Sequence, residues 1–134
     1  MNALAELSAR VEIQEVAARY ADGCDHRDWE AVAALFAEDG VFDAKAVYGR
    51  EVQGRTALAE FLGSLPAAAA HHPTSLYTTF TGPDLATTRM KMLVFFRSAT
   101  FSVDYQWDMA QTGEGWRIAR QSIEVVGKVP VAEG

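Results

Sequence analysis

Apolar residues recur at helical spacing near the start of the chain, which predicts one long helix over residues 13–24. The helix-prone residues 2–10 read as a lead-in turn, with Ser8 as a candidate N-cap. Spacing of three and four residues places side chains on one face of a helix. The apolar face comprises Ile13, Val16, Ala17, Tyr20, Ala21 and Cys24, and the polar face opposite it comprises Glu12, Glu15, Arg19 and Asp22.

Two further helices are predicted by the same periodicity. Asp28 is a candidate N-cap for the second helix, which Gly40 would end in the left-handed conformation. The third opens at residues 54–56 and stops at Pro66. The second helix presents Trp29, Val32, Ala33 and Phe36 on one face, and the third presents Leu58, Phe61, Leu62 and Leu65. Between the first two helices lies a polar cluster, Asp25-His26-Arg27, where the first apolar face stops.

The later part of the chain alternates with a period of two, which predicts β-strands. A short strand over 41–44, with a hairpin partner in 46–53, precedes the third helix. Strands over 74–81, 85–97, 101–110 and 116–126 follow it, separated by Gly-rich turns. The clearest alternation puts Phe101, Val103, Tyr105, Trp107 and Met109 on a buried face.

The last predicted strand contains an irregularity. Trp116 and Ile118 share a face, but the same phase would also place Arg120 there, whereas Ile123 falls on the other face. Either a β-bulge near Arg120 resets the register, or Arg120 points into a pocket. We favour the bulge.

Helices first and antiparallel strands afterwards indicate an α+β fold, with three N-terminal helices packed on one face of a curved, mostly antiparallel sheet. We expect a single domain over residues 1–134, with residues 127–134 as a loose tail. A short sheet bent around helices leaves a conical hollow, which suits a small apolar ligand.

Composition narrows the class of protein. The net charge of −6, without any cluster of Lys and Arg, argues against a nucleic-acid partner. The single cysteine, Cys24, excludes an internal disulfide and fits a reducing compartment. No leader is evident and no run reaches the ~18 apolar residues of a membrane span, so we expect a cytoplasmic protein without a membrane contact. Three histidines and one cysteine at no familiar spacing argue against a metal site.

Several stretches in this order resemble the SnoaL-like group of the nuclear transport factor 2-like superfamily, over about residues 8–126. They are IQEVAARYADGCDHRDWEAVAALFAEDGVF, GR-x-A-L-A-E-F, HH-P-T-S and GEGWRI. The resemblance implies a cone-shaped half-barrel that forms a homodimer through its sheet, binds a small hydrophobic or aromatic molecule and needs no cofactor. The group's enzymes include scytalone dehydratase, hexachlorocyclohexane dehydrochlorinase, polyketide cyclases, steroid Δ-isomerase and limonene epoxide hydrolase. Other members have no known activity or are structural subunits of ring-hydroxylating dioxygenases.

The resemblance also implies a catalytic pair. In the dehydratase and dehydrochlorinase branch, an Asp at the end of the first helix pairs with a His at the start of a strand. Asp25 matches the first, and His71 matches the second by its offset, although Ser75 stands where Asn is usual. His72 is the alternative if the register slips by one. A carboxylate that holds one imidazole nitrogen lets the other take a proton from carbon. In the alternative, non-catalytic interpretation, Asp25 caps a turn and one of the two histidines faces solvent.

The remaining candidates are substrate-binding residues. Tyr20 lies at the centre of the helical apolar face and needs a hydrogen-bond partner if buried, although a core tyrosine is the commoner case. Arg120 could bind an anion or a carbonyl if no bulge turns it away. The other members of this group, mostly core residues of which some line a hollow, are Trp29, His72, Met92, Phe96, Tyr105 and Trp107. Two hypotheses follow: a cofactor-independent lyase, isomerase or cyclase that uses Asp25 and His71, and a non-catalytic ligand-binding or assembly subunit.

Overall fold

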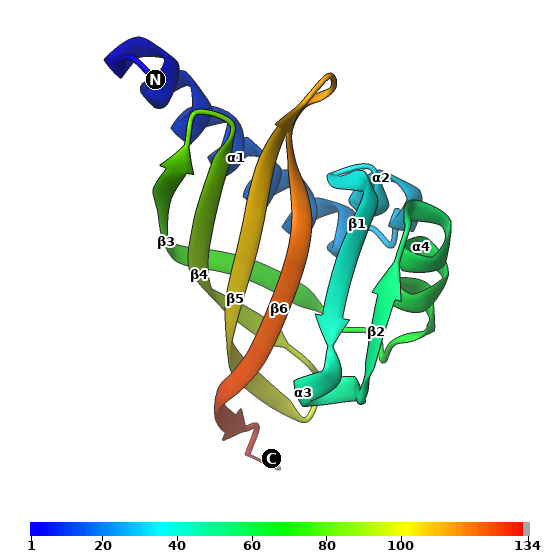
Figure 1. The fold of residues 1–134 in the computed structure, drawn as a ribbon. Helices are drawn as coiled ribbons and strands as arrows, with labels where there is room; N and C mark the ends of the chain where they lie inside the picture. The colour runs from blue at the N-terminus through cyan, green and yellow to red at the C-terminus, as the bar shows by residue number, and fades with distance from the viewer. Residues whose placement is uncertain (133–134) are drawn as a thin grey trace.

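A computed structural model describes residues 1–132 of the protein. Within that range the chain forms four helices and six strands, the strands in the order β2-β1-β6-β5-β4-β3 (Figure 1). The helices are α1 (Ala3–Asp25), α2 (Trp29–Ala33), α3 (Lys45–Tyr48) and α4 (Arg55–Ser64). The strands are β1 (Phe36–Ala44), β2 (Arg50–Gln53), β3 (Ala70–Gly82), β4 (Leu85–Phe95), β5 (Ala99–Thr112) and β6 (Gly115–Pro130).

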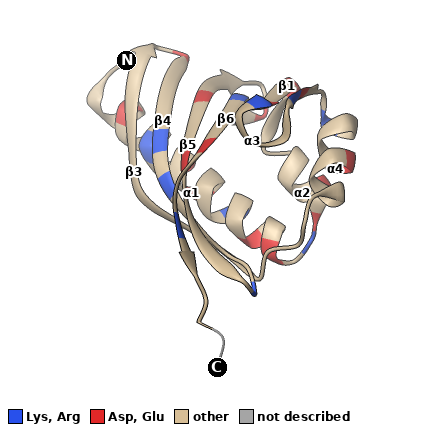
Figure 2. Cartoon of the chain, turned by 90° about the horizontal axis from the view of Figure 1, so that it is seen from below, with Lys and Arg blue, Asp and Glu red and all other residues tan. Residues whose placement is uncertain are grey.

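The sheet curves around the helices and confirms the predicted α+β class. All neighbouring strands are antiparallel except β1 and β6, which run parallel. Helix α1 packs against β3 and β6, while α4 packs against α2 and β1, so the helices cover one face of the sheet (Figure 2). The sheet remains open, because β2 and β3 are its two edges and do not pair with each other. No helix within residues 1–132 is long and apolar enough to cross a membrane.

The first helix is longer than predicted. It begins at Ala3, and the side chain of Asn2, rather than that of Ser8, accepts a hydrogen bond from the backbone N–H of Ala5 at 2.8 Å. The predicted buried face is correct, since Ile13, Val16 and Tyr20 are all nearly inaccessible to solvent.

The second helix is shorter than predicted. Asp28 caps it as expected, but α2 ends at Ala33 and Phe36 already belongs to β1. Tertiary pairing overrides the helical periodicity here, because the backbone N–H of Ile118 in β6 donates to the carbonyl of Leu35. Gly40 therefore does not end a helix; it lies within β1, where a Cβ would come within 2.9 Å of the carbonyl oxygens of Ala37 and Ile118.

Two strand predictions also need correction. The expected hairpin partner 46–53 overlaps the one-turn helix α3 and contains only the short strand β2, so residues 1–132 form four helices rather than three. Strand β6 continues to Pro130, whose pairing with Ala99 extends the sheet into the predicted loose tail. Residues 133–134 of that tail lie outside the described part of the chain.

The predicted bulge in the last strand is confirmed. Asp108 pairs with Arg120 and Met109 with Ile118, which leaves Ala119 as the extra residue. The bulge shifts the phase of β6 by one residue, so Ile118 and Gln121 both face inward. The Arg120 side chain consequently lies on the opposite face.

Candidate active site

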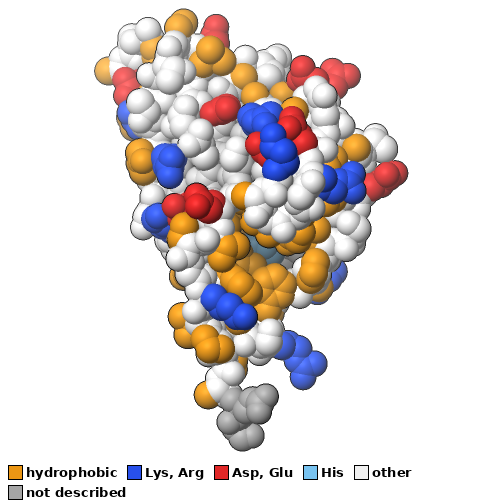
Figure 3. Space-filling view, turned by 60° about the horizontal axis from the view of Figure 1, so that its bottom comes forward, with side chains coloured by type: hydrophobic (Ala, Val, Ile, Leu, Met, Phe, Trp, Pro, Cys, Tyr) orange, Lys and Arg blue, Asp and Glu red, His pale blue; other side chains and the backbone are white. Residues whose placement is uncertain are grey.

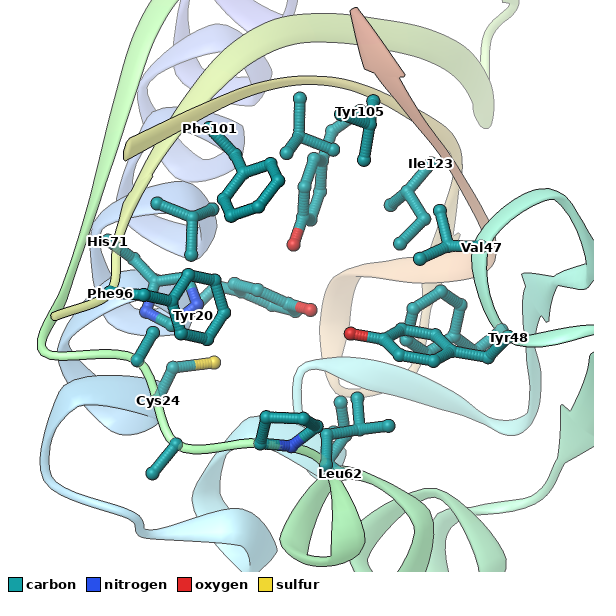
Figure 4. Close-up of a pocket in the computed structure, with 18 of the residues that line it drawn as sticks. Tyr20, Cys24, Val47, Tyr48, Leu62, His71, Phe96, Phe101, Tyr105 and Ile123 are labelled. Atoms are coloured by element: carbon teal, nitrogen blue, oxygen red, sulfur yellow. The ribbon is translucent and has the colours of Figure 1, made fainter. Parts of the chain in front are cut away.

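A cavity of about 370 Å³ opens between the helices and the concave face of the sheet (Figures 3 and 4). Residues from all four described helices and from every described strand except β2 contribute to its wall, which is mostly aliphatic and aromatic. Volume and apolar lining of this kind are typical of small-molecule sites. Figure 3 shows the opening of this cavity, with hydrophobic side chains around it.

Asp25 and His71 meet at this wall. The Nδ1 atom of His71 lies 2.8 Å from Oδ1 of Asp25, and both side chains are largely shielded, with 15% and 27% of their surface exposed. Asp25 is the last residue of α1, and His71 is the second residue of β3. Contact between α1 and β3 thus brings together two residues 46 positions apart in the sequence. His71 lines the cavity and Asp25 lies behind it.

The strand register decides which histidine enters the cavity. His71 pairs with Val94 of β4, and both side chains line the cavity. His72 points to the other face, where its ring packs edge-on against Phe95 with ring centroids 5.3 Å apart. The alternative in which His72 faces the cavity is therefore wrong.

Ser75 does not contribute to the cavity. It has a positive φ of 52° at the irregularity where the β3–β4 register shifts between Thr74 and Tyr77. Its side chain lines a separate shallow groove on the outer face, with Tyr77 and Arg89. The position at which the family resemblance expects Asn thus carries no polar group into the cavity.

Tyr20 is held by a buried hydrogen-bond chain. Nε1 of Trp107 donates to Oε1 of Gln121 at 2.8 Å, and Nε2 of Gln121 donates to the Tyr20 hydroxyl at 2.9 Å. Gln121 and Trp107 are both fully buried. Because the Tyr20 oxygen accepts from Gln121, its own proton is directed elsewhere, and the Tyr105 hydroxyl is the neighbouring group that can accept it.

Three tyrosine hydroxyls face the cavity from different elements. Figure 4 shows those of Tyr20 in α1, Tyr48 in α3 and Tyr105 in β5 turned toward its middle. Burial, reinforced by Tyr105 and Cys24, raises the pKa of Tyr20, and burial likewise raises the pKa of Tyr105 and of Tyr48. The phenols therefore stay protonated at neutral pH and can serve as hydrogen-bond donors.

Cys24 lies in the same wall, one turn after Tyr20. Burial, followed by the neighbouring Asp25 carboxylate, raises the pKa of its thiol to about 12. Thiolate is the nucleophilic form of cysteine, so this environment keeps Cys24 inert.

The other predicted binding residues divide into two groups. Trp29, Phe96 and Tyr105 line the cavity as expected. Met92 and Trp107 do not; both are fully buried in the core. Arg120 does not line it either: its guanidinium donates to Asp43 at 2.9 Å and to Glu51 at 3.1 Å, on the face to which the bulge turns it.

Sequence reasoning missed three residues at the site. Gln121 is in phase with Ile123 and turns inward after the bulge, but only the strand register places the bulge before Gln121. Tyr48 lies on a single helical turn inside a predicted strand. Arg27 was noted only as part of a polar cluster, yet it is the one Lys or Arg among the cavity-lining residues that the structure describes. Within residues 1–132 no group of three or more His, Cys, Asp or Glu side chains is placed to hold a metal ion.

The chain belongs to the SnoaL-like domain family, whose model matches residues 5–122. An uncharacterized protein of Mycobacterium tuberculosis (strain H37Rv) is 28% identical over 134 residues, covering 90% of this chain and 88% of that protein. An NTF2-like protein with a cystatin-like fold from Novosphingobium aromaticivorans is 29% identical, with a TM-score of 0.79 over 92% of this chain and 85% of the other. The hexachlorocyclohexane dehydrochlorinase LinA-type3 from Novosphingobium barchaimii LL02 superposes with a TM-score of 0.87 over 98% and 95% of the two chains, at 16% identity.

Proposed function

We propose that this protein is a cofactor-independent enzyme that moves a proton on a small, largely apolar, oxygenated molecule. The reaction class is dehydration, isomerisation or cyclisation. One observation carries the proposal: the Asp25 carboxylate lies 2.8 Å from His71 Nδ1, and His71 stands in the wall of an apolar cavity. The fold is also that of a protein named for an elimination, the dehydrochlorinase.

Asp25 and His71 together act as a general base, in which His71 takes the proton and Asp25 orients and stabilises His71. The carboxylate accepts the Nδ1–H of the imidazole, which fixes the tautomer and leaves the lone pair on Nε2. Nε2 takes a proton from a carbon beside a carbonyl or beside the carbon that bears a leaving group. The electron pair of the broken C–H bond forms a C=C bond, and either the carbonyl oxygen becomes an enolate or the leaving group departs with its electrons. Asp25 stabilises the imidazolium, which returns the proton in an isomerisation or passes it to the departing oxygen in a dehydration.

The tyrosine hydroxyls act on the oxygen at which negative charge develops. Their raised pKa values keep them protonated, so they donate hydrogen bonds rather than repel an anion. The largely apolar wall strengthens each such interaction because it lowers the local dielectric constant. Gln121 fixes the Tyr20 hydroxyl through the 2.9 Å hydrogen bond, so this donor needs little reorganisation during the reaction.

The test uses hydrogen exchange at carbon, followed by NMR in D₂O with a panel of small cyclic ketones and β-hydroxy ketones. We expect the wild-type protein to catalyse exchange or elimination with at least one of them. His71→Ala should abolish it, and Asp25→Asn should slow it by about a hundredfold. His72→Ala is the matched control, because the neighbouring ring faces away from the cavity. Equal rates in wild type and His71→Ala would refute the pair as a base.

A second readout needs no substrate. The ¹⁵N shifts of the His71 ring report which nitrogen carries the proton, and we expect the Nδ1–H tautomer in wild type and its loss in Asp25→Asn. A panel without any turnover, together with a ring that ignores Asp25→Asn, would favour the alternative of a non-catalytic binding or assembly subunit. The homodimer and the cytoplasmic location stay predictions; light scattering of the purified protein tests the first.

A further inference from the structure

The positive charges of this acidic protein are distributed unevenly. The chain has 12 Lys and Arg residues and a net charge of −6. Eight of the cations form an ion pair or a hydrogen bond with another group of residues 1–132: Arg10, Arg19, Lys45, Arg55, Arg89, Lys91, Arg117 and Arg120. Within the same described range, the four without such a partner are Arg27, Arg50, Arg97 and Lys128.

Three of these four cations belong to, or lie next to, residues that line the cavity. Arg27 is among the residues that line it. Arg97 stands between two lining residues, Phe96 and Ser98. The Lys128 amine lies 5.7 Å from the centre of the Phe101 ring, which is also part of the wall. Lys and Arg side chains are visible around the apolar hollow in Figure 3.

The fourth cation contacts the wall from behind. The Arg50 guanidinium lies 4.9 Å from the centre of the Phe61 ring, and that ring packs edge-on against Tyr48 of the wall. The cations without a partner among the described residues are therefore Arg27 in the cavity wall, Arg97 and Lys128 beside lining residues, and Arg50 behind the wall.

Arg27 is held at the mouth by an unfavourable backbone conformation. Helix α1 ends with hydrogen bonds from Arg27 N–H to Cys24 and from Asp28 N–H to Gly23, the pattern of a Schellman motif. The residue at this point of the motif is left-handed and is usually glycine, whereas Arg27 adopts a φ of 55° there. A non-glycine residue in this region is disfavoured, and such residues concentrate at functional sites.

The neighbouring carboxylates do not neutralise Arg27. Asp25 is turned toward His71, and Asp28 accepts a hydrogen bond from the backbone N–H of Ala31 as the cap of α2. Asp22 is paired with His26. The guanidinium of Arg27 thus has no hydrogen-bond or ion-pair partner within residues 1–132 and is available to a ligand in the cavity that Arg27 lines.

We propose that the molecule bound in the cavity is an anion: an apolar carboxylic acid whose ring or chain fills the cavity and whose carboxylate lies against Arg27. This inference rests on the proposed function for the site and names its substrate class. A guanidinium binds a carboxylate with two parallel charge-assisted hydrogen bonds. The surrounding cations at the rim raise the local concentration of anions in an otherwise acidic protein.

Calorimetry with a matched pair of probes, 2-naphthoate and 2-naphthamide, tests the inference, because the two differ mainly in charge. We expect wild type to bind naphthoate about tenfold more tightly than naphthamide. Arg27→Gln and Arg27→Gly should lose that preference while they keep the affinity for naphthamide. Arg89→Gln is the control: this arginine is exposed and hydrogen-bonded to Gln106 on the outer face of the sheet, so the preference should persist.

A thermal melt separates this role from a structural one. Because glycine is the favoured residue at a left-handed position, Arg27→Gly should raise Tm by about 3 °C even as the preference for naphthoate disappears. A lowered Tm would show that Arg27 serves the fold and would count against the inference. Equal affinities in wild type, or failure of both probes to bind at millimolar concentration, would overturn it. The His71 exchange test and ring shifts are measured separately, so this failure would not be mistaken for failure of the catalytic proposal.

Discussion

At the scale of single residues, Gln121 links the core of the molecule to its cavity. It uses both ends of its amide, accepting from Trp107 and donating to Tyr20, at 2.8 and 2.9 Å. A fully buried amide is stabilising only when its polar atoms are paired, so this side chain has little freedom. Its orientation in turn sets the direction in which the Tyr20 hydroxyl points.

We predict that Gln121→Leu destabilises the protein by about 2 kcal/mol, because the Trp107 N–H then lies buried without an acceptor. Urea unfolding measures the change. Gln111→Leu is the control, since Gln111 is exposed and its side chain makes no buried contact. Equal effects of the two substitutions would show that the hydrogen-bond chain does not contribute.

At the scale of elements, Arg120 joins three strands on the face away from the core. From β6 it reaches Asp43 at the end of β1 and Glu51 in β2. The pKa of Glu51 lies below its ordinary value of 4.5, mainly because Glu51 accepts a hydrogen bond from Arg120. The backbone N–H of Lys45, and then Arg120, lowers the pKa of Asp43 below 3.8. The bulge at Ala119 makes this contact available by turning Arg120 outward.

The pH dependence of stability follows from the sign of these shifts. A carboxyl group with a lower pKa in the folded state stabilises the fold above its unfolded pKa, and this contribution is lost as the pH falls through the folded value. Tm should therefore drop on acidification from about pH 5 to about pH 3. Arg120→Gln should lower Tm at neutral pH and reduce the acid-induced drop.

Arg19→Gln is the matched control for this prediction. Arg19 forms an exposed pair with Glu15 at 3.6 Å, and exposed pairs of this kind contribute little. An acid-induced drop that is identical in wild type and Arg120→Gln would contradict the prediction.

At the scale of the whole molecule, the parallel pairing of β1 with β6 holds the N-terminal helices to the sheet. Phe36 pairs with Ile118, and the register shifts before Val41 pairs with Arg120. Gly40 lies within this shift, where the neighbouring backbone leaves no space for a side chain. The pairing of β1 with β6 joins β1, β2 and the Tyr48 part of the cavity wall to the rest of the sheet.

We predict that Gly40→Ala destabilises the protein by about 2 kcal/mol, because the added Cβ would lie 2.9 Å from two carbonyl oxygens and strands β1 and β6 would have to separate. Thermal and urea unfolding measure the change. Gly113→Ala, in the turn before β6, is the control, since no atom lies within 4 Å of its Cβ position. A Gly40→Ala protein as stable as the control would show that the strands can move apart at no cost.

The candidate site was predictable to different degrees. His71 and Asp25 were identified through the resemblance to the SnoaL-like group, because periodicity alone did not predict that Asp25 is partly buried. Tyr20 was visible as the centre of a helical face, but its partner Gln121 was not, since a one-residue bulge decides which way Gln121 points. The unusual feature of Arg27 is that a charged residue occupies the position after a helix where glycine is usual. This feature becomes apparent only once its φ is known.

The sequence by itself determined the class of each long element, because this depends on local periodicity: 3.6 residues for α1 and α4, and 2 for β3 to β6. It also identified the buried faces of α1, α4 and β5. Tertiary structure decided where β1 begins, that α3 interrupts the first hairpin, and that β6 extends to Pro130. It also decided the cavity, since a single-residue change of register moves every following side chain to the other face of a sheet. Such choices depend on contacts between residues far apart in the chain, such as Phe36 with Ile118 and Asp25 with His71, and local patterns carry no information about them.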